Sequence, residues 1–179
     1  MIYLFLADGF EEIEALTVVD LLRRAELDIK TVSVKADRLV MGAHKVQLVA
    51  DLVMEDVDYD QSQAFILPGG MPGTTNLSKN KALLELLIRA NSEEKMIAAI
   101  CAAPTIFGDL GFLEGRKAVC YPGFESKLKG AIIAEEPAVR DGHIITSKAA
   151  GTAVEFSLKL IKHLKSKEDS MNIKRAILY

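Results

Sequence analysis

Two residues combine a reactive side chain with a position suited to chemistry, Cys101 and Glu14. Cys101 follows the apolar run 96–100 and precedes two alanines and Pro104, which predicts a strand that turns sharply into a helix. A thiol placed under a helix N-terminus is expected to ionise readily, because the helix dipole favours the thiolate. The alternative is a buried structural cysteine, a common place for a free cysteine.

Glu14 is expected to face the protein core. Projecting the predicted helix 11–25 at about 100° per residue places Glu14 between Leu21 and Ala25 in the apolar sector. A carboxylate there is costly unless it is protonated or paired. Beside a reactive group, such an acid would tune a pKa. The alternative is a first-turn acid that stabilises the helix dipole.

Gly69 and Gly70 directly follow another apolar run. Their backbone N–H groups, together with that of Ala102, could form an oxyanion or anion pocket facing the cysteine. A plain tight turn is the alternative for this glycine pair.

Apolar runs alternate with amphipathic helical patterns along the chain. Strands are predicted at 2–7, 29–34, 64–67, 96–100, 118–121, 132–134 and 139–146, the last divided by a turn, and helices at 11–25, 81–90, 104–110 and 152–164. The β-rich segment 39–54 is interpreted as a hairpin or a bent pair. This alternation predicts one α/β domain over 1–179, with a mostly parallel sheet covered on both faces. Chemistry then gathers beyond the carboxyl ends of the strands, where Cys101 and the glycine pair lie.

Composition excludes several function classes. The net charge is -3 with 22 basic and 25 acidic residues, which favours neither nucleic acid nor a membrane as partner. No apolar run approaches the length of a membrane span, and no secretory signal is predicted. Two cysteines in apolar surroundings indicate a reducing cytoplasm rather than a disulfide framework. The Lys-rich stretch 159–174 is interpreted as a solvated face.

No cofactor or metal is predicted. The sequence has no dinucleotide-binding or phosphate-loop glycine motif, and its three histidines lack zinc-ligand spacing with either cysteine. The same helical projection places Ile13 on the polar side of its helix. We therefore expect Ile13 to contribute to a homodimer contact. The expected ligand is a small molecule, either an aldehyde or an oxidant.

Four segments together resemble the ThiJ/PfpI superfamily, most closely its DJ-one-like branch. They are ADGFEEIE at 7–14, LPGG at 67–70, AAICAAP at 98–104, and ITS at 145–147 with the Gly-Thr pair at 151–152. The resemblance runs over nearly the whole chain. It implies a flavodoxin-like three-layer sandwich, usually a homodimer, without a cofactor.

The resemblance also implies roles for individual residues. Cys101 matches the family's oxidisable elbow cysteine, and Glu14 matches the protonated acid that holds it as thiolate or sulfinate. Gly69 and Gly70 match the glycines that line the same pocket. Arg24 is similar to an arginine that helps bind anions near the cysteine. Relatives are associated with glyoxalase, deglycase, chaperone and oxidative-stress functions.

One departure concerns the segment that carries Cys120 and Tyr121. Tyr121 occupies the position where glyoxalase-active relatives place a histidine, and no histidine follows Cys101. The missing Cys–His pair argues against peptidase activity and weakens the glyoxalase interpretation. On a strand only one of Cys120 and Tyr121 can face the site, and Tyr121 is predicted to do so.

Three functional hypotheses remain open from the sequence. In the first, the Cys101 thiolate attacks an aldehyde carbonyl, and Glu14 shuttles the proton for rearrangement to a 2-hydroxy acid. In the second, Cys101 is a redox sensor that oxidises to sulfenic and then sulfinic acid, with Glu14 donating a hydrogen bond to the product. In the third, a dimeric binding or holdase protein carries an incidental cysteine.

Overall fold

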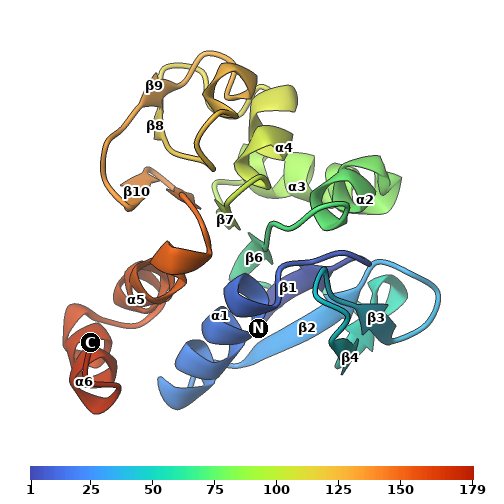
Figure 1. Cartoon of the computed structure of the whole chain (residues 1–179), viewed down its shortest axis with the longest axis horizontal. Helices are drawn as coiled ribbons and strands as arrows, with labels where there is room; N and C mark the ends of the chain where they lie inside the picture. Colours follow the sequence, from blue (N-terminus) through green and yellow to red (C-terminus); the bar gives the residue numbers. More distant parts are fainter.

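The computed structural model describes residues 1–179, and its central feature is a seven-stranded sheet (Figure 1). The strand order is β10-β11-β7-β6-β1-β2-β5, and every neighbouring pair is parallel except β10 with β11. The sheet strands are β1 (Ile2–Leu6), β2 (Ile29–Ser33), β5 (Leu52–Val53), β6 (Ala64–Leu67), β7 (Met96–Ile100), β10 (Ala138–Asp141) and β11 (Ile144–Ser147). The mostly parallel sheet predicted from the sequence is confirmed.

Six α-helices and two small strand pairs complete the fold. The helices are α1 (Glu12–Arg24), α2 (Gly73–Lys79), α3 (Lys81–Ser92), α4 (Pro104–Asp109), α5 (Ala153–Leu164) and α6 (Lys167–Ala176). The antiparallel pair is β3 (Leu39–Met41) with β4 (Gln47–Val49), and the parallel pair is β8 (Lys117–Ala118) with β9 (Ile132–Ile133). Single 3-10 turns occupy Met54–Asp56, Glu125–Lys127 and Ala150–Thr152.

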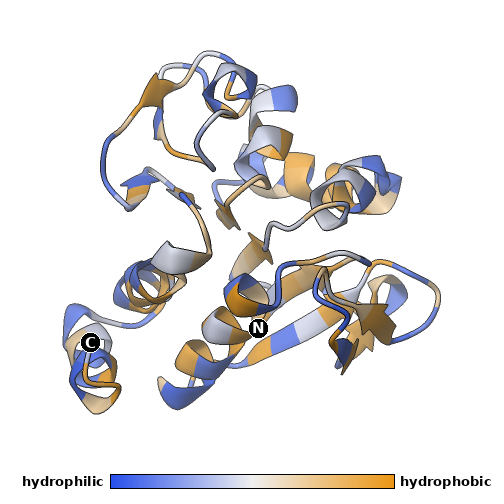
Figure 2. Ribbon diagram, in the orientation of Figure 1, coloured by the Kyte–Doolittle hydropathy of each residue, from blue (hydrophilic) through white to orange (hydrophobic).

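Helices cover both faces of the sheet, which explains why its strands are continuous apolar runs. Along β1, Ile2 and Leu4 join one hydrophobic cluster with α1 and α5, whereas Tyr3 and Phe5 join a second cluster with α3 and α4. Figure 1 shows α1 and α5 on one side of the strands and α2, α3 and α4 on the other. In Figure 2 most of the central strands and the inward helix faces are hydrophobic, and the outward helix faces are largely hydrophilic.

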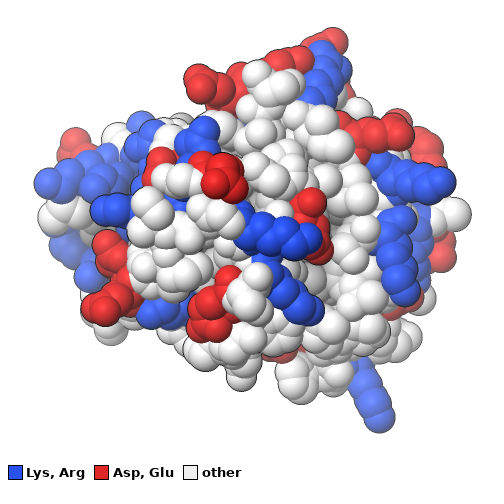
Figure 3. All heavy atoms as spheres, turned by 90° about the horizontal axis from the view of Figure 1, so that it is seen from above, with Lys and Arg blue, Asp and Glu red and all other residues white.

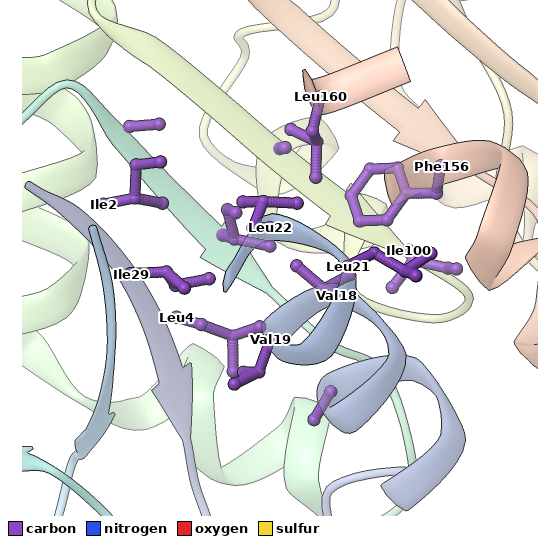
Figure 4. Packing of buried hydrophobic residues seen from close by; sticks show 14 of the residues in the cluster. Ile2, Leu4, Val18, Val19, Leu21, Leu22, Ile29, Ile100, Phe156 and Leu160 are labelled. Atoms are coloured by element: carbon purple, nitrogen blue, oxygen red, sulfur yellow. The ribbon is translucent and has the colours of Figure 1, made fainter. Parts of the chain in front are cut away.

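The helix that carries Glu14 is held firmly against the sheet. Val18 and Leu22 of α1 are fully buried and pack with Leu4 of β1 and Phe156 of α5 (Figure 4). Burying one such side chain contributes roughly 1.5–3 kcal/mol. This packing keeps the first turn of α1, and with it Glu14, at the carboxyl edge of the strands.

Two helices differ from the sequence predictions. The stretch 159–174, expected to be a solvated face, includes α6, whose Ile173 is buried against the cluster that contains α5. Ser166 begins α6 by accepting a hydrogen bond from the Asp169 N–H at 3.0 Å. Helix α2 was also not predicted. No helix in the structure combines the length and the apolar character needed to cross a bilayer.

Candidate functional site

Cys101 lies in a strained turn between β7 and α4. Its φ is +66°, a left-handed conformation that is costly for a residue other than glycine. The turn is fixed by its backbone, because the Cys101 N–H donates to the Ser147 carbonyl at 3.0 Å and the Tyr121 N–H donates to the Cys101 carbonyl at 2.8 Å. Strain of this kind is concentrated at functional sites, and here it leaves the thiol partly exposed.

Glu14 is a buried carboxyl on the first turn of α1, only 1% exposed. The Gly69 N–H donates to its Oε2 at 2.8 Å, and its Oε1 has no hydrogen-bond partner within the chain. Burial raises the pKa of Glu14 to about 7, an effect opposed by hydrogen bonds from the Cys101 thiol and the Gly69 amide and reinforced by the charge of Glu11. Near neutral pH this carboxyl can therefore hold or release a proton.

Gly69 is where Cys101 and Glu14 meet. A Cβ on this glycine would lie 2.6 Å from the Cβ of Cys101 and 2.7 Å from Oε2 of Glu14. Glycine at this position therefore allows the acid and the thiol to approach each other closely. The Gly69 amide binds the carboxyl of Glu14 rather than facing the cysteine, as had been expected from the sequence.

The backbone amides that bind the Cys101 sulfur are those of Ala102 and Gly70, and their hydrogen bonds lower the pKa of the thiol. Gly70 has a φ of +91°, and a Cβ there would lie 2.4 Å from the backbone nitrogen of Glu11. Only glycine fits this conformation and this space. The two amides form a small donor pocket of the kind that stabilises negative charge on sulfur or oxygen.

The thiol itself does not have the depressed pKa predicted from the sequence. Burial, followed by the Glu14 carboxylate, raises the pKa of Cys101 to about 12, more than the amides of Ala102 and Gly70 lower it. Helix α4 has only six residues, so its dipole is too short to overcome a buried carboxylate. Cys101 and Glu14 therefore titrate as one pair in which a second negative charge is strongly disfavoured.

Tyr121 and Cys120 lie outside any strand, because β8 ends at Ala118. The predicted strand 118–121 stops early, since the next N–H, that of Val119, donates to the Thr146 hydroxyl at 2.9 Å. Cys120 is 3% exposed and belongs to the core. Tyr121 is 46% exposed and contacts the Cys101 turn through its backbone, while its ring packs edge-on against Phe124.

Arg24 is not brought to this group within one chain. It lies ten residues beyond Glu14 on α1, about 15 Å along the helix axis, and its Nε binds Asp20 at 2.7 Å. Ile13 is on the outside of the same helix and is 56% exposed. The sequence analysis did not single out Glu11, although its spacing of three residues from Glu14 places the two acids on neighbouring positions of one helix face, where the Glu11 charge raises the pKa of Glu14.

A second polar cluster, not predicted from the sequence, lies beside the start of α1. Carboxylate oxygens of Glu11 and Glu12 and a ring nitrogen of His44 lie within 4.8 Å of one another. Glu12 accepts hydrogen bonds from the His44 N–H at 2.8 Å and pairs with the His44 ring at 2.9 Å. These bonds fasten the β3–β4 hairpin to α1 and account for the buried Glu12 as a structural residue.

Comparisons with known proteins agree on one family. The model of the DJ-1/PfpI family matches residues 1–163. Protein DJ-1 homolog B of Arabidopsis thaliana is 38% identical to this chain over 93% of the chain's length. The match covers only 39% of the Arabidopsis protein, so this chain spans less than half of that relative. A Pyrococcus abyssi protein named as a deglycase is 29% identical over 89% of this chain and 96% of its own. The structure of oxidised Toxoplasma gondii DJ-1 superposes with a TM-score of 0.95 at 34% identity, covering 99% of this chain and 97% of that one.

Proposed function

The chain belongs to the DJ-1/PfpI family, and from that premise we propose that it is a stress-response enzyme that converts small reactive dicarbonyls to 2-hydroxy acids. Cys101 is the nucleophile and Glu14 carries the proton. The observation that supports this most directly is the convergence of a strained cysteine, a carboxyl with a pKa of about 7, and two amides on one point. The deglycase name of the Pyrococcus relative agrees with this substrate class.

The reaction begins when the Cys101 thiolate attacks the aldehyde carbon of a 2-oxoaldehyde such as methylglyoxal. A carbon–sulfur bond forms, and the carbonyl electron pair moves to oxygen, where the Gly70 and Ala102 amides stabilise the oxyanion. Protonated Glu14 transfers its proton to this oxygen, which gives a hemithioacetal and a carboxylate.

The Glu14 carboxylate then removes the proton from the former aldehyde carbon and returns it to the neighbouring carbon, while the hydroxyl proton of the hemithioacetal passes to the oxygen of that neighbouring carbon. This internal transfer oxidises the first carbon to a thioester and reduces the second to an alcohol, so no external redox partner is needed. Water hydrolyses the thioester to the 2-hydroxy acid and frees the thiol. The net reaction is addition of one water molecule to the dicarbonyl.

The test is lactate formation from methylglyoxal by Cys101→Ser, with Cys120→Ser as the matched control. Cys120 is buried in the core, and its thiol bonds the Tyr121 carbonyl rather than Cys101 or Glu14, so its substitution should leave turnover intact, whereas Cys101→Ser should abolish it. Turnover that survives Cys101→Ser would refute the proposal.

A second candidate is a redox sensor at the same thiol, which the oxidised state of the Toxoplasma relative favours. Peroxide would transfer one oxygen to the thiolate and leave as water, and a second peroxide would convert sulfenic to sulfinic acid. Protonated Glu14 would donate a hydrogen bond to the sulfinate. Glu14→Gln should then change the product series seen by mass spectrometry after peroxide treatment, and an unchanged series would count against this function.

The quaternary structure we propose is a homodimer through the face formed by α1 and the β3–β4 hairpin. Four large apolar side chains there are about half exposed or more: Ile13, Leu39, Val46 and Val49. The hairpin is bound to α1 by the Glu12 contacts and by a bridge between Phe10 and Gly42, so these side chains belong to one rigid surface. An apolar patch of this kind marks an interaction site.

A reducing cytoplasm, which keeps Cys101 as a thiol, is the proposed location.

A further inference from the structure

A groove unrelated to Cys101 runs along the outer face of α5. Three hollows of about 340, 160 and 250 Å³ adjoin one another there. The first two share Arg140 and His163, and the last two share Lys159 and Lys162. The β10–β11 hairpin forms one end of this groove and α6 forms the other.

The central hollow is lined by basic side chains alone: Arg140 from β10, and Lys159, Lys162 and His163 from α5. None of the four forms an ion pair within the chain, and Arg140 contacts only the Gly142 carbonyl, at 2.8 Å. The whole chain has a net charge of -3, so this is a local reversal of sign. Figure 3 shows several Lys and Arg side chains, interspersed with Asp and Glu, at the left end of the molecule, the side on which α5 and α6 lie in Figure 1.

Two histidines, His143 and His163, lie beside Arg116 and Arg140. Burial and then the Arg140 charge lower the pKa of His163. Burial and then the Arg116 charge lower the pKa of His143, in the adjoining hollow, and the Glu94 charge opposes them. The Arg140 and Arg116 charges are the part of these effects that a bound anion would offset.

The helix dipole accounts for only two of the four basic residues in the central hollow. Lys162 and His163 lie in the last turn of α5, where the helix dipole favours basic residues. Lys159 lies in the middle of the helix, and Arg140 belongs to a different element, so the dipole accounts for neither. An anionic ligand accounts for all four.

We propose that this central hollow binds a phosphate group, as inorganic phosphate or as a phosphate monoester. A volume of about 160 Å³ corresponds to roughly five water molecules, which suits one tetrahedral oxyanion. Arg140 supplies planar paired donors, and the lysines supply mobile ammonium groups to the remaining oxygens. The two outer hollows, which also contain Glu94 and Glu155, leave room for the rest of an ester.

Phosphate binding has a readout that is independent of the cysteine. A bound phosphate dianion would offset the Arg140 charge at His163 and raise the pKa of that ring. The only other charged groups lining the central hollow are Lys159 and Lys162. The shift at His163 therefore reports the ligand.

The experiment follows the ring proton of His163 by NMR while inorganic phosphate, and separately glycerol phosphate, is added at constant ionic strength. We expect a saturable shift and a higher His163 pKa with at least one of the two probes, and whichever binds more tightly identifies free phosphate or an ester as the ligand. Lys162→Gln should weaken binding roughly tenfold, the loss of one charge-assisted hydrogen bond. Lys81→Gln, the same change on α3 across the sheet, should leave binding unchanged.

The proposal is overturned if neither probe shifts His163 more than sodium chloride of equal ionic strength. It is also overturned if Lys162→Gln and Lys81→Gln weaken binding equally, because general charge would then explain the effect. Circular dichroism of each variant is the check on folding and should match that of the wild-type protein, since both lysines are exposed.

Discussion

Replacing Glu14 by glutamine should change the pH dependence of Cys101 reactivity in a way that follows from the coupled pair. In the wild-type protein the pKa of Glu14 is about 7, and that of Cys101 is about 12 once the carboxylate is charged. Above pH 7, raising the pH removes the proton from Glu14 first. The small fraction of molecules with a thiolate beside a protonated carboxyl then stays constant.

The Glu14→Gln protein has no carboxyl to lose its proton, so its thiolate fraction keeps rising tenfold per pH unit up to the thiol pKa. In both proteins the reactive species is a thiolate beside a neutral group, so its intrinsic nucleophilicity is similar. The ratio of variant to wild-type alkylation rates should thus be about 1 below pH 7, about 10 at pH 8 and about 100 at pH 9.

The assay is the rate of alkylation by iodoacetamide between pH 6 and 9, read by mass spectrometry, with Cys120→Ser in both proteins so that only Cys101 is modified. We expect a wild-type profile that flattens above about pH 7 and a variant profile that continues to climb. Parallel profiles over the whole range would refute the inference that Glu14 and Cys101 share one negative charge.

Three further predictions concern stability and assembly. Folding raises the pKa of Glu14 from 4.5 to about 7, so between these pH values the native state binds one more proton than the unfolded state. The free energy of unfolding should therefore fall by about 3 kcal/mol as the pH rises through this window. Urea titrations should show this fall in the wild-type protein and not in Glu14→Gln. Gly69→Ala should abolish turnover and lower the free energy of unfolding by about 1–3 kcal/mol. Gly151→Ala should do neither, because a Cβ at Gly151 has no atom within 4 Å. Ile13→Lys should shift sedimentation toward monomer, and Ile88→Lys, equally exposed on α3, should not.

Much of the fold was predictable because its strands carry strong local signals. The runs that became β6 and β7 were assigned with the bounds that the structure has, since buried parallel strands are short, apolar and limited by turn residues. Helix α1 followed from its apolar stripe. That same stripe placed Glu14 on the inner face, and the strand-end rule placed Cys101 at the same edge of the sheet.

The parts that were not predicted depend on tertiary contacts. Helix α6 is mostly polar, and its stability comes from the Ser166 cap and from packing of Ile173. The strand predicted at 118–121 ends early because a side-chain hydroxyl, that of Thr146, replaces a strand partner. The Thr146 contact and the packing of Ile173 have no local sequence signature, whereas the spacing of Ser166 and Asp169 is a helix-start signal that the sequence analysis did not use.

The electrostatics of the site were also beyond the sequence pattern. The elbow motif predicted a depressed thiol pKa, but this depends on how long α4 is and on how close Glu14 lies to Cys101. The Gly69 amide was expected to face the cysteine, and the structure turns it toward the acid. Backbone direction within a glycine pair is set by the strands on both sides and not by the pair itself.

The most direct test of the central proposal, that Cys101 and Glu14 act as one catalytic pair, is lactate formation from methylglyoxal by the Glu14→Gln protein. We predict that turnover is lost while Cys101 alkylates faster than in the wild-type protein at pH 8, because the nucleophile is freed but the proton carrier is gone. A Glu14→Gln protein that forms lactate at the wild-type rate would contradict the account.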